Sequence, residues 1–106
     1  MGGRGGGGRT QVSSPGAARD ENRILRLTTD LEGVHRESWV SLAQLRDNLS
    51  GMSRERQDAA IARLLKEGRI GLTSEQEPRQ VRARERNAAF RHAGVNYHLL
   101  RVRRNS

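Results

Sequence analysis

The chain has 106 residues, which suits one small domain, and it contains no cysteine. A disulfide framework, a thiol nucleophile and zinc sites with Cys ligands are therefore excluded, and a cytoplasmic location is expected. The formal net charge is +8, and every basic residue except Lys66 is an arginine. No apolar run approaches the length of a membrane span or a signal-peptide core, so no membrane partner is expected.

The positive charge is concentrated at the C-terminal end of the chain. Residues 20–78 contain nine basic and eleven acidic residues, whereas residues 79–106 contain eight basic residues and one acidic residue. A basic patch within one segment raises the local affinity for phosphates through counterion release, while an evenly spread charge mostly serves solubility. The distribution therefore favours a nucleic-acid partner over a purely solubilising role.

Residues 1–16 predict a disordered Gly/Arg-rich tail, and residues 17–104 predict a single domain. Arg4 and Arg9 are set among glycines in the tail, as in flexible arms that follow a phosphate backbone or enter a minor groove. A solvated leader without a binding role is the alternative.

The pattern between residues 17 and 32 predicts the first helix. Apolar residues from Ile24 to Leu31 recur at helical spacing, and Gly33 is suited to end the helix. Residues 37–41 contain a β-favouring pair and predict a short strand that leads into a second helix.

Two short helices joined by a tight turn are predicted next. Ser41 is the expected N-cap of a helix over residues 42–49, and Ser53 is the expected N-cap of a third helix that ends at Gly68. The turn between them contains Gly51. Such a pair of helices with a short turn containing glycine is typical of a helix-turn-helix motif.

Two strands, residues 69–73 and 97–102, follow the third helix. The long connection between them predicts a helix within residues 79–92, ended by Gly94. This order of elements is that of a winged helix-turn-helix fold. We therefore expect an α+β, mainly α domain with three helices, a small antiparallel sheet and a helix inserted in the wing.

The segment from Trp39 to Leu72, WVSLAQLRDNLSGMSRERQDAAIARLLKEGRIGL, resembles the helix-turn-helix core of bacterial winged-helix proteins. The opening Ser-Leu-x-x-Leu and the closing Leu-Leu-Lys-Glu-Gly-Arg-Ile carry the resemblance. RERNAA at residues 84–89, followed by Gly94 and by HLL at residues 98–100, is similar to a pattern in small uncharacterised winged-helix proteins of GC-rich bacteria. The resemblance implies a winged-helix fold more specifically than an activity.

The third helix presents a candidate groove-reading face on the side opposite its apolar stripe. Small alanines there would allow a close approach to a groove, arginines would reach base edges or phosphates, and the lysine a phosphate. The candidate contacts of this helix are Arg54, Arg56, Ala59, Arg63 and Lys66. An ordinary solvated face is the alternative, because acidic residues leave this helix with a net charge of only +1.

The arginine-rich C-terminal segment supplies the expected phosphate contacts. The candidates are Arg82, Arg84, Arg86, Arg91, Arg101 and Arg103. The last two share one face of the final strand, which forms a basic edge if it is exposed and is structural if it pairs with carboxylates.

Other residue types give no further site. His35, His92 and His98 are too scattered for a metal site, and His98 is expected in the core or at an interface. Trp39 is expected to anchor the core, because one aromatic cannot make the row that single-strand binders use. With no catalytic constellation and no phosphate-binding loop, neither an enzyme nor a cofactor is expected.

Together these features predict a DNA-binding regulator or accessory factor, active for example in transcription regulation. It would read the major groove of double-stranded DNA with the third helix and contact the backbone with an Arg-rich wing. In a bacterium it would be associated with the nucleoid. Two alternatives stay open: a winged helix that binds a protein partner or forms a homodimer without DNA, and an RNA- or ribosome-associated protein, which the Arg- and Gly-rich tail favours.

Overall fold

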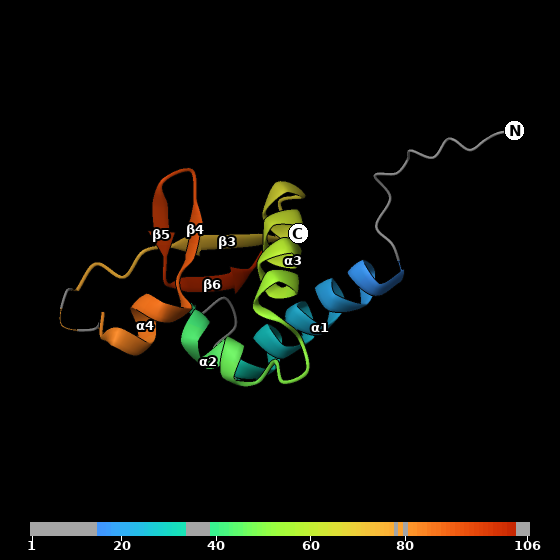
Figure 1. Cartoon of the computed structure of the whole chain (residues 1–106), viewed down its shortest axis with the longest axis horizontal. Helices are drawn as coiled ribbons and strands as arrows, with labels where there is room; N and C mark the ends of the chain where they lie inside the picture. The colour runs from blue at the N-terminus through green and yellow to red at the C-terminus, as the bar shows by residue number, and fades with distance from the viewer. Residues whose placement is uncertain (1–14, 34–38, 78, 80, 104–106) are drawn as a thin grey trace, which may run out of the picture.

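The computed structural model describes residues 15–33, 39–77, 79 and 81–103. Within these residues the elements follow in the order α1 (Pro15–Glu32), β2 (Val40–Ser41), α2 (Leu42–Asp47), α3 (Arg54–Lys66), β3 (Ile70–Thr73), α4 (Ala83–Ala88), β4 (Phe90–His92), β5 (Val95–Tyr97) and β6 (Leu99–Val102) (Figure 1). The expected α+β architecture with a small antiparallel sheet is confirmed. Residues 1–14, which hold most of the predicted tail, lie outside the described residues.

Two serine caps fix where α2 and α3 begin. The Ser41 hydroxyl accepts a hydrogen bond from the Gln44 backbone N–H, and the Ser53 hydroxyl accepts one from the Arg56 backbone N–H. At the other end of α3, Gly68 has a φ of +73°, a left-handed conformation that costs glycine little. Both predicted N-caps and the glycine that ends α3 are therefore confirmed.

The sheet has β6 in the middle, paired antiparallel with β2 on one side and β3 on the other. Val40, Ile70 and Leu100, one from each strand, are at most 4% exposed. These three side chains therefore define an inner face that is turned toward the helices. Because side chains alternate along a strand, the residues between them lie on an outer face.

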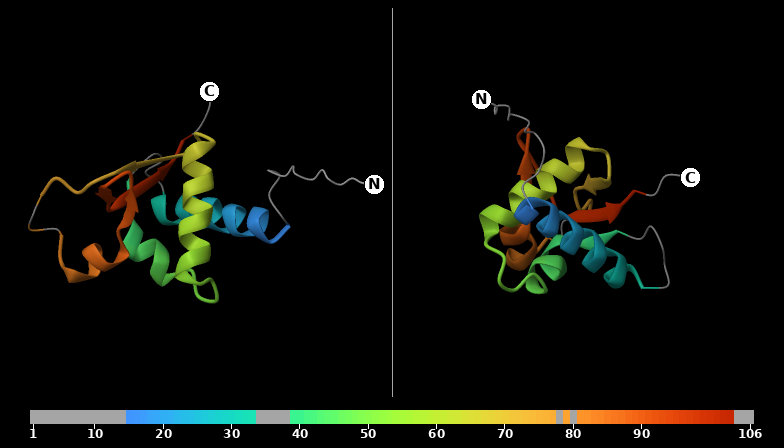
Figure 2. Two further views of the ribbon diagram at one scale, coloured as in Figure 1. Left: turned by 45° about the horizontal axis from the view of Figure 1, so that its top comes forward. Right: turned by 90° about the vertical axis from the view of Figure 1, so that its right-hand side faces the viewer.

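The helices pack against the inner face of the sheet. Ile24 of α1, Leu45 of α2 and Ile61 of α3 are fully buried in one cluster with Leu100 of β6. α1 crosses α3, as both views of Figure 2 show. α4 and the β4–β5 hairpin lie at the end of the molecule away from the beginning of α1 (Figure 1).

The connection between β3 and β6 differs from the predicted inserted helix over residues 79–92. α4 covers only Ala83–Ala88, and residues 90–92 form β4. Gly94 does not end a helix, because Ala93 and Gly94, with φ of +52° and +80°, make a two-residue turn between β4 and β5. Such a turn needs positive φ at both positions, and its usual sequence signal is Asn-Gly or Asp-Gly. Ala-Gly lacks this signal, so the hairpin is not predicted from the sequence.

Other boundaries differ by a few residues. α1 begins at Pro15, inside the predicted tail, because proline suits the first position of a helix. α2 ends at Asp47, before the expected residue 49. Tyr97 pairs with Phe90 in the hairpin and not with the final strand, which begins after His98.

Candidate nucleic-acid interface

The third-helix candidates Arg56 and Arg63 are engaged by α1. The Arg56 guanidinium donates hydrogen bonds of 3.0 and 2.6 Å to the two oxygens of the Asp20 carboxylate. The Arg63 guanidinium forms an ion pair with Glu21. Together with Ala59, these side chains line a groove between α1 and α3. A contact from either arginine to a DNA base therefore competes with its ion pair to α1.

The Arg56–Asp20 pair is a charged hydrogen bond at the edge of the core. The hydrogen bonds from Arg56 hold the pKa of Asp20 below its ordinary value, although burial acts in the opposite direction. The same hydrogen bonds raise the pKa of Arg56. Both groups are therefore ionised at neutral pH, and the pair ties the first half of α1 to α3.

We expect the Asp20 carboxylate to contribute to stability at neutral pH but not in strong acid. Its pKa in the folded protein lies below the ordinary value of 3.8, so the contribution is complete above that value and is lost as the pH falls through the folded pKa. Asp20→Asn should therefore be less stable than the wild type at pH 7, and the difference should shrink at about pH 2.5. Thermal unfolding followed by circular dichroism measures both, and a difference independent of pH would contradict the prediction.

The other two charged candidates of α3, Arg54 and Lys66, differ in whether they are already bound within the protein. Arg54 donates hydrogen bonds to the backbone carbonyls of Asn87 and Ala89 and lies 3.5 Å from the Asp58 carboxylate. Lys66 is exposed and forms no ion pair with the described residues. Of the predicted third-helix cations, Lys66 is therefore the one that is available to a phosphate without breaking a contact in the described structure.

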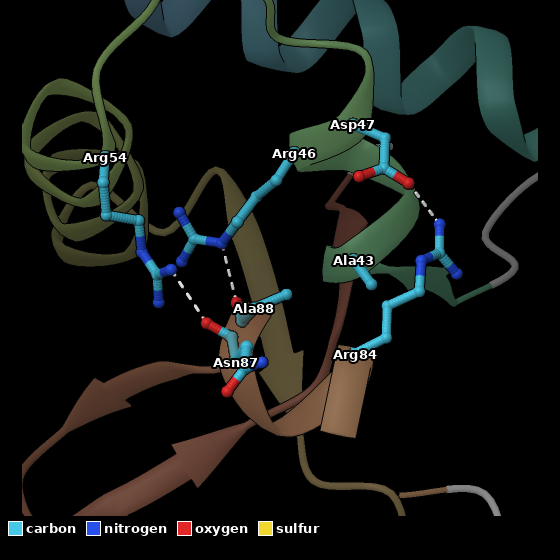
Figure 3. Close-up of a pocket in the computed structure, with 7 residues that line it drawn as sticks. All are labelled: Ala43, Arg46, Asp47, Arg54, Arg84, Asn87 and Ala88. Atoms are coloured by element: carbon cyan, nitrogen blue, oxygen red, sulfur yellow. Dashed lines mark hydrogen bonds and ion pairs between the residues drawn. The ribbon is translucent and has the colours of Figure 1, made fainter. Parts of the chain in front are cut away.

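Figure 3 shows a pocket where arginines from three helices meet. Arg46 of α2, Arg54 of α3 and Arg84 of α4 line it, together with Asp47. Arg84 forms an ion pair with Asp47, so this predicted phosphate contact is already bound to a carboxylate. The pocket is shaped by contacts between protein groups, and its arginines join α4 to α2 and α3.

Arg46 is the most enclosed of these arginines and is missed by the sequence analysis. Its side chain is 9% exposed and donates hydrogen bonds to the Ala88 carbonyl, the Gln57 side-chain oxygen and the Asp58 carboxylate. Burial lowers the pKa of Arg46, while Asp58 acts in the opposite direction. These partners lie far from Arg46 along the chain, so no local sequence pattern indicates the contacts. The role of Arg46 is to hold α2, α3 and α4 together.

The guanidinium groups of several C-terminal candidates, in contrast, form no ion pair with a described carboxylate, although the Arg82 backbone N–H donates a hydrogen bond to Glu85. Arg82, Arg86 and Arg91 are exposed. Arg86 donates a hydrogen bond to the Val81 carbonyl, and Arg91 donates one to the Asn96 side-chain oxygen. These acceptors are neutral, so the charges of the arginines are not compensated. Uncompensated, exposed guanidinium groups are the kind that contact phosphates.

Trp39 is not the predicted core anchor. Its side chain is 41% exposed, and the Arg101 guanidinium carbon lies 4.7 Å from its ring centroid. The neighbouring Val40 takes the inner face of the sheet, and alternation therefore turns Trp39 to the outer face. Arg101 and Arg103 share this outer face, as predicted, because the Cγ atoms of both lie close to the position that a Cβ on Gly71 would have.

A basic stripe on α1 is also missed by the sequence analysis. Arg19, Arg23 and Arg26 line a surface hollow with Asn22. Their spacing of four and three residues places them on one side of the helix. None of the three arginines forms an ion pair with a described residue. The spacing is visible in the sequence and could have identified the stripe.

The structure gives no alternative chemistry for the histidines that it describes. His92 stacks on Phe90, and the His98 Nδ1 accepts a hydrogen bond from the Glu75 backbone N–H. His35 lies outside the described residues. Within residues 15–33, 39–77, 79 and 81–103, no group of His, Asp and Glu side chains is arranged to hold a metal ion. In that same part of the chain, no helix has the length and apolar character needed to cross a membrane.

Comparison of the chain with protein-family models, with curated proteins and with solved structures gives no match. The proposal for the function therefore rests on the chain's own residues. Among them, the decisive difference is between arginines that are held by carboxylates and arginines that are not.

Proposed function

We propose that the protein binds nucleic acid, and double-stranded DNA in particular, mainly through phosphate contacts of its C-terminal arginines. The observation that carries this proposal is that Arg82, Arg86 and Arg91 are exposed and that their guanidinium groups form no ion pair with a described carboxylate. Each arginine that neutralises a phosphate releases condensed counterions, which is the main source of affinity in non-specific DNA binding. The net charge of +8 also favours the approach to a polyanion.

We also propose that the domain is a winged helix. In support, α2 and α3 come between β2 and β3 along the chain, and the strands lie in the sheet in the order β2-β6-β3. α4 and the β4–β5 hairpin then form an elaborated wing between β3 and β6. α4 and the β4–β5 hairpin lie toward one end of the domain (Figure 1); α4 contains Arg86, β4 contains Arg91, and Arg82 directly precedes α4.

The proposed role is that of an accessory factor with little sequence preference. Phosphate contacts fix the position of a protein on the duplex but carry no sequence information directly. The arginines best placed on α3 to read bases, Arg56 and Arg63, are bound to Asp20 and Glu21. Base readout by α3 therefore competes with ion pairs inside the protein.

Fluorescence anisotropy with labelled duplexes of about 20 base pairs tests the proposal. We expect dissociation constants of about 1 to 100 μM at 150 mM salt, within about threefold for unrelated sequences. A structured RNA of equal charge serves as the competitor. Stronger binding to the RNA would favour the RNA-associated alternative, and no binding to either would contradict the proposal.

A specific observation also supports the protein-interaction alternative. Arg54, Arg56 and Arg63 of α3 are all ion-paired within the molecule, which leaves that helix face close to neutral. A neutral face suits a protein partner better than a phosphate backbone. This function becomes the leading one if the anisotropy experiment detects no nucleic acid.

A further inference from the structure

The outer face of the sheet carries the chain's single tryptophan in an exposed position. Trp39 is 41% exposed, and Arg101 of the central strand stacks over its ring. The Trp39 Cη2 atom lies 3.7 Å from the point where a Cβ on Gly71 would stand. The indole therefore reaches across β6 toward β3, and its far end lies over Gly71.

The surroundings of the indole are basic. Arg103 is exposed, and its Cγ lies 3.8 Å from the same point above Gly71, while the Arg101 Cγ lies 3.9 Å from it. By strand alternation the remaining outer-face residues of the three strands are Ser41, Thr73 and Leu99, none of which is acidic. Arg69, whose backbone pairs with Arg103 beyond the ends of β3 and β6, lies at the edge of this face, 3.8 Å from the Glu67 carboxylate. An exposed aromatic ring beside Arg101 and Arg103, with no acidic residue among the described strand residues of this face, matches an anionic ligand that has flat rings.

We propose that this outer face, defined by Trp39, Gly71, Arg101 and Arg103, binds unpaired bases of a single-stranded nucleic acid. Aromatic rings and guanidinium groups stack on bases, and such stacking tolerates any base because every base has a π-face. The arginines contribute a second interaction, with the flanking phosphates. The inference rests on the proposed nucleic-acid binding and adds a second ligand class, at a surface distinct from the arginines of α4 and β4.

Single-stranded nucleic acid fits this face better than a duplex does. In a duplex the bases are stacked on one another, and their π-faces are not available to an indole that stands on the surface of a sheet. A protein partner would in general require a larger apolar patch, whereas Trp39 and Val95 are the only large apolar side chains exposed in the described residues. One ring cannot make the aromatic row that binders of long single strands use, which is the reason that the sequence does not predict this site; the single ring at Trp39 is expected to contact only one or two bases.

The test uses the full chain and two strands that carry equal phosphate charge. One is a 12-nucleotide oligothymidylate, and the other is an abasic strand of the same length. Because Trp39 is the chain's only tryptophan, its fluorescence reports on this face alone. We expect the oligothymidylate to quench Trp39 and to bind about 5- to 100-fold more tightly than the abasic strand, the range for stacking of one base.

Two variants separate stacking from charge. Trp39→Leu should bind both strands with the affinity of the abasic strand, while Trp39→Tyr should retain a preference for bases. Val95→Ala, at an equally exposed apolar position on β5, is the matched control and should leave the preference unchanged. Equal affinity of the wild type for the two strands, or binding without quenching, would overturn this inference and leave the proposed function standing. Absence of binding to these strands and to a duplex would overturn both.

Discussion

Replacing Arg82, Arg86 and Arg91 with glutamine is expected to flatten the salt dependence of DNA affinity strongly. Each phosphate contact on duplex DNA contributes about −0.9 to the slope of log affinity against log salt, so three contacts account for about 2.7 units. Between 50 and 200 mM salt, the wild type should therefore lose about 40-fold more affinity than the triple variant. Anisotropy across a salt series measures both slopes.

The matched control replaces Arg69 and Arg84 with glutamine. These side chains are 48% and 57% exposed, but each already has a carboxylate partner, Glu67 and Asp47 respectively. In this control variant we expect the slope of log affinity against log salt to change less for each replaced arginine than it does in the triple variant. Circular dichroism confirms that both proteins are folded. Equal changes per arginine in the two proteins would show that binding depends on net charge alone, and parallel lines for triple variant and wild type would remove these arginines from the interface.

Arg46→Met should destabilise the fold by about 2 to 4 kcal/mol, because it removes a nearly buried charged group from three acceptors at once. The Ala88 carbonyl and the Gln57 side-chain oxygen lose their guanidinium donor. Asp58 is 40% exposed and keeps Arg54 at 3.5 Å, which places the expected loss below that of a fully buried pair. For a domain of this size the melting temperature should fall by about 10 to 20 °C.

Denaturant unfolding followed by circular dichroism gives the free energy of unfolding for this comparison. Arg69→Met is the control, since its partner Glu67 is 3.8 Å away and both side chains are about half exposed. An exposed pair of this kind contributes about 0 to 1 kcal/mol. If Arg46→Met were no more destabilising than Arg69→Met, the role of Arg46 in joining three helices would be wrong.

The parts of the fold that follow from local chemistry are predicted from the sequence. Ser41 and Ser53 cap their helices with their own hydroxyl groups, and Gly68 ends α3 by its own conformation. Such signals involve residues three or four positions apart, which a single sequence displays directly. The outline of α2, α3 and β3 depends on these signals and is confirmed.

The features that fail depend on tertiary partners. The Asp20–Arg56 pair joins residues 36 positions apart, and Arg46 reaches Ala88 across 42 positions. Helical periodicity shows that Arg56 points away from the core but not that α1 lies over it. For Trp39 the amino-acid type favours burial, while the register of β2 against β6 decides its face. Candidate arginines can therefore be chosen from the sequence. Whether each of them is already held by a carboxylate of the protein cannot be predicted from the sequence.

The contact between α1 and α3 makes the carboxylates of Asp20 and Glu21 built-in competitors of any anion that approaches Arg56 and Arg63. These carboxylates are part of the same chain, so they compete at a high effective concentration that dilution does not change. The apparent affinity of a ligand for Arg56 and Arg63 equals its intrinsic affinity multiplied by the fraction of molecules in which these ion pairs are open. An open fraction of about 1% would weaken that binding about 100-fold. Arg86 and Arg91 have neutral hydrogen-bond acceptors and face no such competition. A ligand that also contacts Arg56 or Arg63 must therefore supply the free energy that opens their ion pairs.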